Sequence, residues 1–175
     1  YFTFMQNLPL VTVICLCYNH QKFVKATLNS VLKQTYPNIE LIIVDDNSKD
    51  SSVNEIKEWF NENPNFQLIL NEMNIGNTKS FNKALSLASG DYVIDLAADD
   101  ILLPDCVAKQ INTFQNSKEK KLGIVYGNMN LVDENSNFIS IYYKDDEHPE
   151  SGNIYNMIIS RSTKICSVSS MIKKE

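Results

Sequence analysis

Several features that would place a protein in a particular class are scarce or missing here. No apolar run approaches the ~18 residues that a transmembrane helix requires, and the N-terminal YFTFMQNLPL lacks the basic start and apolar stretch of a signal peptide. A net charge of −5 argues against a nucleic-acid partner, because such proteins usually carry a basic face. The first strand–helix turn, CYNHQKF, has no glycine-rich fingerprint, which argues against a nicotinamide-binding domain.

Cysteine and histidine are too few and too scattered to predict a zinc site. The cysteines are Cys15, Cys17, Cys106 and Cys166. The first two alternate within an apolar run, so we expect them to be small core side chains. Reduced structural thiols are typical of a cytoplasmic protein, which is the predicted location. The two histidines, His20 and His148, have no partner spacing, and surface positions are expected for both.

The order of apolar patterns predicts an α/β protein. A chain of 175 residues and 20.0 kDa is most simply one domain with a full core. Continuous apolar runs typical of buried strands alternate with helical stripes. The expected strands cover 10–17, 40–44, 67–70 and 92–96, and the helical stripes cover 24–32, 53–60, 81–88 and 107–114. This alternation predicts a doubly wound, mostly parallel sheet with helices on both faces.

The last third of the chain breaks this alternation. Residues 129–132 and 138–142 flank the turn DENSN, which predicts a late antiparallel hairpin added to the sheet. The polar stretch 144–152 is expected to be a solvated acidic turn in preference to a substrate lid. A strand near 124–126, a short helix near 154–159 and a strand near 168–172 complete the prediction.

Two pairs of adjacent acids follow two of the predicted strands. Asp45 and Asp46 end the run IELIIVDD, and Asp99 and Asp100 end DYVIDLAADD. Ligands of open α/β sheets bind at the carboxyl ends of the strands, so both pairs should face one crevice. Crowded carboxylates need compensation, and oxygen ligands favour Mg²⁺ or Mn²⁺. The alternative for any single aspartate is a cap on the following helix.

Weaker signals surround these acids. Tyr18, just past the first strand, could stack on a base or be an ordinary half-buried tyrosine. Asn19 could hold the loop through an Asx-type hydrogen bond. Gly76 in NIGNTKS precedes a predicted helix, where backbone amides could meet an anion.

Taken in order, these segments resemble the family-2 glycosyltransferases of GT-A fold. The resemblance is carried by VTVICLCYNHQKFVKATLNSVLKQTYPNIELIIVDDNSKDSS and by NIGNTKSFNKALSLASGDYVIDLAADDILLP, and it continues loosely to the end of the chain. It implies transfer of a sugar, with inversion, from a nucleotide-diphosphate donor to an acceptor hydroxyl. A UDP-sugar donor, a sugar or glycolipid acceptor and a role in polysaccharide biosynthesis are the expectations.

The resemblance also assigns roles to individual residues. Tyr18 would pack on the nucleobase and Asp46 would hydrogen-bond it. Asp99 would coordinate the Mg²⁺ or Mn²⁺ that bridges the diphosphate, and Asp100 would lie on the acceptor side. The complete set expected at the nucleotide is Cys17, Tyr18, Asn19, Asp45, Asp46 and Ala98.

The sequence departs from the family pattern at two points. Ala97 stands where the first acid of the Asp-X-Asp motif is expected, and Asp95 lies too deep on the strand to replace it. No residue matches the family's general base, which lies downstream of the strand near 168–172. We therefore expect a single domain that is truncated at its C-terminus and weak or inactive alone. Residues 1–9 would be a leader or tag remnant, 10–104 the nucleotide-sugar-binding half and 105–175 the start of the acceptor half.

Two other classes of protein stay open at this stage. A phosphoacceptor receiver domain also has acids at strand ends, but its acidic pair follows the first strand. Here a complete strand–helix unit precedes Asp45. A non-catalytic sugar-nucleotide-binding or scaffold module is the other alternative, favoured by Ala97. The full-length protein is expected in the cytoplasm, with peripheral attachment at the inner face of the membrane as a further expectation.

Overall fold

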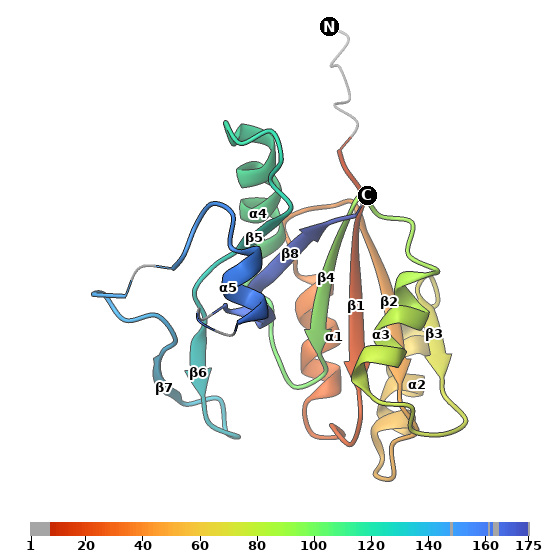
Figure 1. The fold of residues 1–175 in the computed structure, drawn as a ribbon. Helices are drawn as coiled ribbons and strands as arrows, with labels where there is room; N and C mark the ends of the chain where they lie inside the picture. The colour runs from red at the N-terminus through yellow and green to blue at the C-terminus, as the bar shows by residue number, and fades with distance from the viewer. Residues whose placement is uncertain (1–7, 148, 161, 163–164, 175) are drawn as a thin grey trace, which may run out of the picture.

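A six-stranded sheet forms the centre of the computed structural model, which describes residues 8–174 apart from 148, 161, 163 and 164. The strand order is β3-β2-β1-β4-β8-β5 (Figure 1). The strands are β1 (Val11–Cys17), β2 (Ile39–Asp45), β3 (Gln67–Leu70), β4 (Tyr92–Ala97), β5 (Ile124–Tyr126) and β8 (Ser170–Lys173). Strands β1 to β4 are parallel, whereas β8 runs antiparallel to both β4 and β5. The predicted mostly parallel sheet is confirmed.

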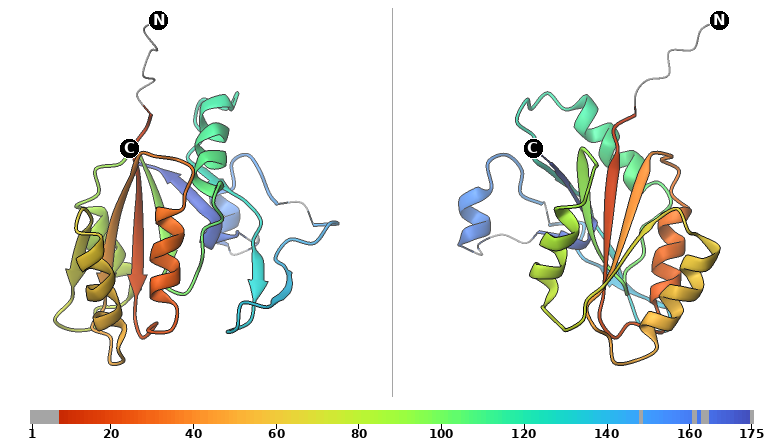
Figure 2. Two further views of the ribbon diagram at one scale, coloured as in Figure 1. Left: turned by 180° about the vertical axis from the view of Figure 1, so that it is seen from behind. Right: turned by 90° about the vertical axis from the view of Figure 1, so that its right-hand side faces the viewer.

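Helices cover both faces of this sheet (Figure 2). One face carries α1 (Val24–Leu32), α2 (Ser52–Glu62) and α4 (Cys106–Asn116), and the other carries α3 (Asn77–Leu85). Alternate residues of β1 enter the two cores. Val13 and Cys15 pack on the first face, while Ile14 and Leu16 pack on the second. This is why apolar residues occupy both faces of β1, with Thr12 as the one polar residue of the strand.

The order of the strands reverses at β1. The chain winds from β1 outward through β2 to β3, and then crosses to the other side of β1 to form β4. In register, Cys17 lies opposite Asp45 of β2, and Leu16 lies opposite Ala97 of β4. The carboxyl ends of these three strands are therefore level at the reversal point, which is where open α/β sheets bind ligands.

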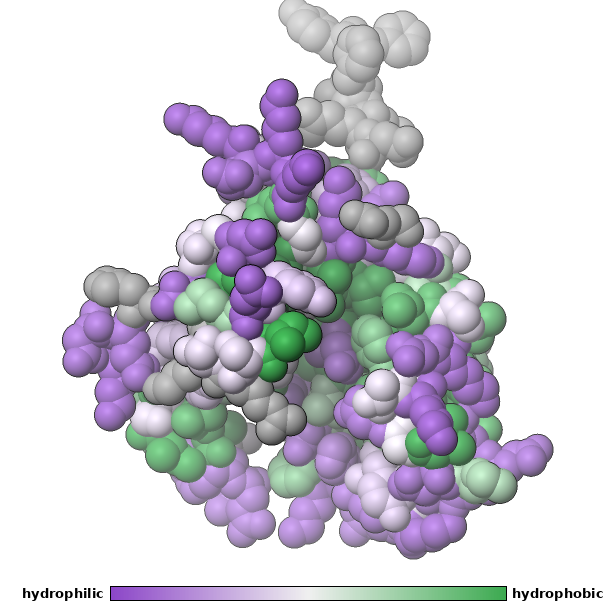
Figure 3. Space-filling view, viewed as in Figure 1, coloured by the Kyte–Doolittle hydropathy of each residue, from purple (hydrophilic) through white to green (hydrophobic). Residues whose placement is uncertain are grey.

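The predicted hairpin is present but stands apart from the main sheet. Its strands, β6 (Asn130–Val132) and β7 (Phe138–Ile141), pair with each other in a two-stranded sheet. The antiparallel strand of the main sheet is β8 instead. The side chains of Phe138 and Ile139 are each 63% exposed, and Figure 3 shows apolar side chains gathered over this hairpin. A short helix, α5 (Tyr155–Ile159), follows, and a 3₁₀ turn (Ser167–Ser169) leads into β8.

Gly90 lies where the loop before β4 meets the first strand. Its amide donates to Thr12 Oγ1 at 3.0 Å. A Cβ atom at this position would lie 2.7 Å from the Thr12 backbone nitrogen and 2.9 Å from the Leu10 carbonyl oxygen. Because backbone atoms cannot move aside, glycine is required for β4 to pair with β1.

Replacement of this glycine should destabilise the whole sheet. We expect Gly90→Ala to lower the free energy of unfolding by roughly 1–3 kcal/mol, the usual cost of overpacking. Urea denaturation would measure it. Gly123→Ala is the matched control, since a Cβ at Gly123 meets nothing within 4 Å. Equal stability of the two variants would contradict the steric argument.

Candidate functional site

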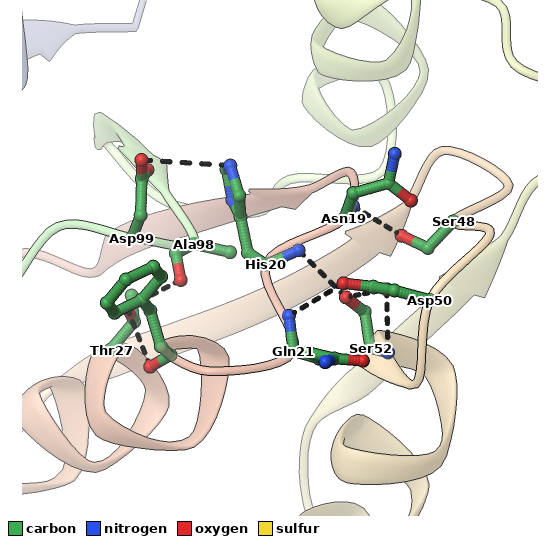
Figure 4. Close-up of polar contacts among 10 residues, drawn as sticks. Asn19, His20, Gln21, Thr27, Ser48, Asp50, Ser52, Ala98 and Asp99 are labelled. Carbon is green, nitrogen blue, oxygen red and sulfur yellow. Dashed lines mark hydrogen bonds and ion pairs between the residues drawn. The ribbon is translucent and has the colours of Figure 1, made fainter. Parts of the chain in front are cut away.

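Two loops at the reversal point are joined to each other by hydrogen bonds (Figure 4). The Asn19 amide donates to Ser48 Oγ at 2.9 Å, and Asn19 Oδ1 accepts from the Lys49 amide at 2.7 Å. The His20 amide donates to Ser52 Oγ at 2.8 Å. Asn19 has a φ of 62°, a left-handed conformation that asparagine tolerates better than most residues. Among the described residues, the Asn19 side chain does not make the predicted local Asx-type bond; it connects the β1–α1 loop to the β2–α2 loop.

Asp45 is used to build the second of these loops. Its side chain is buried, and it accepts the Ser48 amide at 2.9 Å and the Ser48 hydroxyl at 2.5 Å. Both carboxylate oxygens are thus occupied within the turn that leads to α2. These bonds stabilise a local turn and are not the helix cap expected as the alternative for a single aspartate, because α2 begins only at Ser52. A contact from Asp45 to a nucleotide stays a prediction.

Asp46 holds the loop between β3 and α3. Its carboxylate accepts from Asn71 Nδ2 at 2.9 Å and from the amides of Ile75 and Gly76 at 2.9 and 2.8 Å. Burial by itself would raise the pKa of the Asp46 carboxyl, but these donors outweigh burial and hold the pKa below its ordinary value. The backbone amides before α3, which the sequence indicated as an anion site, therefore bind the protein's own carboxylate.

The second acidic pair is used differently. The Asp99 side chain is 46% exposed, and among the described residues no hydrogen bond to its carboxylate is found. Its neighbour is His20, whose Nε2 lies 3.7 Å from Asp99 Oδ2. Burial, and then the negative charge of Asp99, raise the pKa of the Asp100 carboxyl, while His20 opposes them. The Asp99 carboxylate is therefore available to a ligand.

Cys17 and Ala98 lie beneath the crevice with their side chains in the core. They are 2% and 0% exposed. Burial raises the pKa of the Cys17 thiol to about 11, so the thiol stays neutral at pH 7. The carbonyl oxygen of Ala98 accepts from Thr27 Oγ1 at 2.9 Å, which anchors the end of β4 to α1. Tyr18, by contrast, is 42% exposed.

Ala97 and Asp95 lie on β4 as the sequence indicated. Ala97 is opposite Leu16 near the end of the strand, and Asp95 is opposite Ile14, two residues farther from the crevice. Asp95 therefore lies deeper in the sheet than the position of the missing acid, and the prediction that it does not replace that acid is consistent with the register.

His20 is the site residue that sequence reasoning missed. A surface position was expected, but its side chain is 28% exposed and its ring faces Asp99 across the ends of β1 and β4. The available signal was its place two residues after Tyr18, in the turn after the first strand. The pairing with Asp99 was not visible, because 78 intervening residues separate them in sequence.

Asp99 and Asp100 line a cavity of about 830 Å³. It lies between the start of α1, α4 and the hairpin turn, and residues such as Lys22, Phe23 and Asn128 line it. Within the described part of the chain, Tyr18, Asn19 and Asp46 are outside its lining. Asp99 and Asp100 thus belong to the lining of this cavity, whereas those three residues do not.

The donors present suit a cation that is shared with a phosphate ligand. In the described ranges, no group of three or more His, Cys, Asp or Glu side chains could hold a metal ion alone. Mg²⁺ and Mn²⁺ at phosphate sites commonly take one or two carboxylates and complete their coordination with phosphate and water oxygens. Asp99, exposed at the reversal point, fits that requirement.

A level crevice with acids at a strand reversal is typical of α/β proteins that bind a ligand at the carboxyl ends of their strands. The profile of glycosyl transferase family 2 matches residues 12–166. The chain therefore belongs to this family. Over 133 residues it is 35% identical to an uncharacterized glycosyltransferase of Methanocaldococcus jannaschii, covering 75% of this chain and 45% of that protein. It is 34% identical over 131 residues to a poly-beta-1,6-N-acetyl-D-glucosamine synthase of Staphylococcus epidermidis, covering 75% of this chain and 31% of that protein.

Solved GT-A glycosyltransferases share the fold. A mannosyltransferase from Pyrobaculum calidifontis in complex with GDP-Man and Mn²⁺ matches with a TM-score of 0.59 and 26% identity, covering 69% of this chain and 36% of that one. TarS of S. aureus in complex with UDP-GlcNAc matches with a TM-score of 0.55 and 29% identity, covering 61% and 31%. The chain spans less than half of each of these proteins. Within the described residues, no helix has the length and apolarity needed to cross a membrane.

The stability of the site loops should depend on the Asp46 carboxylate. We expect Asp46→Asn to lower the free energy of unfolding at pH 7 by roughly 1–3 kcal/mol, because the amide nitrogen cannot accept the bonds. The pKa of Asp46 is depressed in the folded protein. Its contribution to the free energy of unfolding is therefore fully present above the ordinary pKa near 4, and it is lost as the pH falls through the pKa of the folded state.

Urea denaturation from pH 7 to pH 3 would measure this, with Glu62→Gln, an exposed residue, as the control. The difference in the free energy of unfolding between Asp46→Asn and wild type should become smaller as the pH falls. The control should have the same free energy of unfolding as wild type at pH 7. A difference that stays constant with pH would contradict the assignment.

Proposed function

We propose that this chain binds a nucleotide-diphosphate sugar, with a UDP-sugar as the expected donor, for metal-dependent, inverting transfer to an acceptor hydroxyl. The observation that carries the proposal is the Asp99 carboxylate. It lies at the strand reversal without a hydrogen bond from the described residues, and the exposed Tyr18 follows the neighbouring strand. The nucleotide sugars in the complexes of the related mannosyltransferase and of TarS support it.

The nucleoside would lie over the two joined loops. Tyr18 offers an exposed aromatic face on which a base can stack. Asp46 Oδ2 accepts one bond, from Gly76, and a carboxylate oxygen has a second acceptor direction that can receive an N–H of the base. Asn19 and Asp45 hold the loops that shape this space, and Cys17 and Ala98 form its floor.

The diphosphate would lie at Asp99. A bound Mg²⁺ or Mn²⁺ supplies a positive charge that stabilises the leaving diphosphate. Asp99 would hold that cation with one carboxylate, because alanine stands at position 97, where the first acid of the motif is expected. The protein's part is to place Asp99 at the end of β4, where the Ala98 amide donates to the Leu16 carbonyl oxygen at 2.9 Å.

The acceptor would enter from the opposite side, through the cavity of about 830 Å³. Asp100 lines this cavity next to Asp99, which supports the proposal that it lies on the acceptor side of the diphosphate. Polar groups such as Lys22 and Asn128 and apolar groups such as Phe23 line the same cavity. This mixture suits a sugar or glycolipid, whose rings present both hydroxyl groups and apolar faces.

The donor proposal is tested by ligand-induced stabilisation. With UDP and Mn²⁺ at about 100 times the dissociation constant, binding adds about 2.7 kcal/mol, which raises the Tm by roughly 5–10 °C for a chain of this length. Asp99→Asn should lose the Mn²⁺-dependent part of the shift, and Tyr18→Ala should weaken the shift with and without Mn²⁺. Differential scanning fluorimetry measures both.

Glu62→Gln, which changes an exposed residue of α2, should keep the full shift. ADP and GDP in place of UDP test the choice of base. Absence of a shift with every nucleoside diphosphate would refute the donor site.

A further inference from the structure

We propose that His20 is a second protein ligand of the cation at Asp99, through Nε2, and that it makes the site prefer Mn²⁺ to Mg²⁺. This inference rests on the proposed function, because it needs a cation at Asp99. It deepens that function by naming a ligand from the β1–α1 loop, on the opposite side of the crevice from the Asp-X-Asp position.

The separation of the two side chains suits one shared ion. His20 Nε2 and Asp99 Oδ2 are 3.7 Å apart, and the side chains point toward one another (Figure 4). Two ligand atoms that are each about 2.1 Å from one octahedral cation lie about 3.0 Å apart when they occupy neighbouring positions. The observed distance is too long for a good hydrogen bond, and a contraction of about 0.7 Å, within reach of small side-chain rotations, would bring both atoms to one cation.

The backbone of His20 is held at both of its polar groups. Its amide donates to Ser52 Oγ at 2.8 Å, and its carbonyl oxygen accepts the amides of Phe23 and Val24 at 2.9 and 3.0 Å. Nδ1 is buried and has no partner in the described part of the chain. Nε2 is therefore the ring nitrogen that faces the crevice, and the loop keeps it near Asp99 before any ligand arrives.

Alanine at position 97 leaves a coordination position of the cation that His20 can take. An acid at the end of β4 would supply a second oxygen ligand, but alanine stands there. An imidazole ligand from the end of β1 replaces the missing donor with nitrogen. Mg²⁺ is a hard ion that prefers oxygen, whereas transition-metal ions bind imidazole more readily, so a mixed nitrogen–oxygen site should favour Mn²⁺.

The direct test looks for nitrogen bound to Mn²⁺. Electron spin-echo envelope modulation of the wild-type chain with Mn²⁺ and UDP should show coupling to ¹⁴N, and protein grown with ¹⁵N-histidine should show the ¹⁵N pattern instead. The labelling separates histidine from the nitrogens of UDP and requires no variant. Because the chain has only two histidines, His148→Gln should keep the signal and His20→Gln should lose it.

Metal affinities supply the second readout. We expect His20→Gln to weaken Mn²⁺ binding in the presence of UDP by about tenfold or more, in line with the loss of groups that support a metal site. Mg²⁺ binding should change much less. Asp99→Asn should weaken both ions, and Glu62→Gln should weaken neither. Isothermal titration calorimetry gives the constants, and urea denaturation confirms that each variant is folded.

The outcomes separate this inference from the function on which it rests. If Mn²⁺ and UDP stabilise wild type but no histidine coupling is seen, the His20 assignment is refuted and the donor site stands. Mn²⁺ and Mg²⁺ affinities that fall in parallel in His20→Gln would also refute it. If neither ion changes the binding of UDP to wild type, both the metal site and this inference fail.

Discussion

The pairing of β1 with two parallel neighbours is the constraint on which the rest of the structure depends. Hydrogen bonding to β2 on one side and to β4 on the other brings three carboxyl ends to one level, although β4 follows β2 by nearly fifty residues. The pairing with β4 in turn requires Gly90, because any Cβ would meet the backbone of Thr12. A crevice exists because the chain reverses its winding direction at β1.

Within that crevice, the first acidic pair stabilises loops, whereas the second pair is accessible to a ligand. Asp45 and Asp46 are buried, and their oxygens accept hydrogen bonds that shape the loops before α2 and α3. Asp99 is exposed, and the neighbouring Asp100 has a raised pKa. A carboxylate that accepts several protein donors positions a loop, whereas one without them can hold a cation. Two similar motifs in sequence thus acquire different roles through their hydrogen-bond partners.

The joined loops also explain why His20 belongs to the site. The amides of Asn19 and His20 donate to Ser48 and Ser52, and these bonds hold the β1–α1 loop against the β2–α2 loop. In this position the imidazole of His20 faces Asp99. Asp99 and Asp100 also line the cavity that reaches α4 and the hairpin turn. In the proposed function, donor and acceptor would meet at this second acidic pair.

The sequence by itself determined the α/β class, the parallel strands and the family, because apolar periodicity and the two acidic motifs are local patterns. It also indicated Asp99 and Ala97, which lie within one such motif. Only the tertiary structure decided that β8, and not the hairpin, joins the main sheet. It also decided that the Asp46 carboxylate accepts the amides of Gly76 and Ile75, and that His20 faces Asp99. Each of these depends on contacts between segments distant in the chain, and local pattern does not record which distant segments will meet.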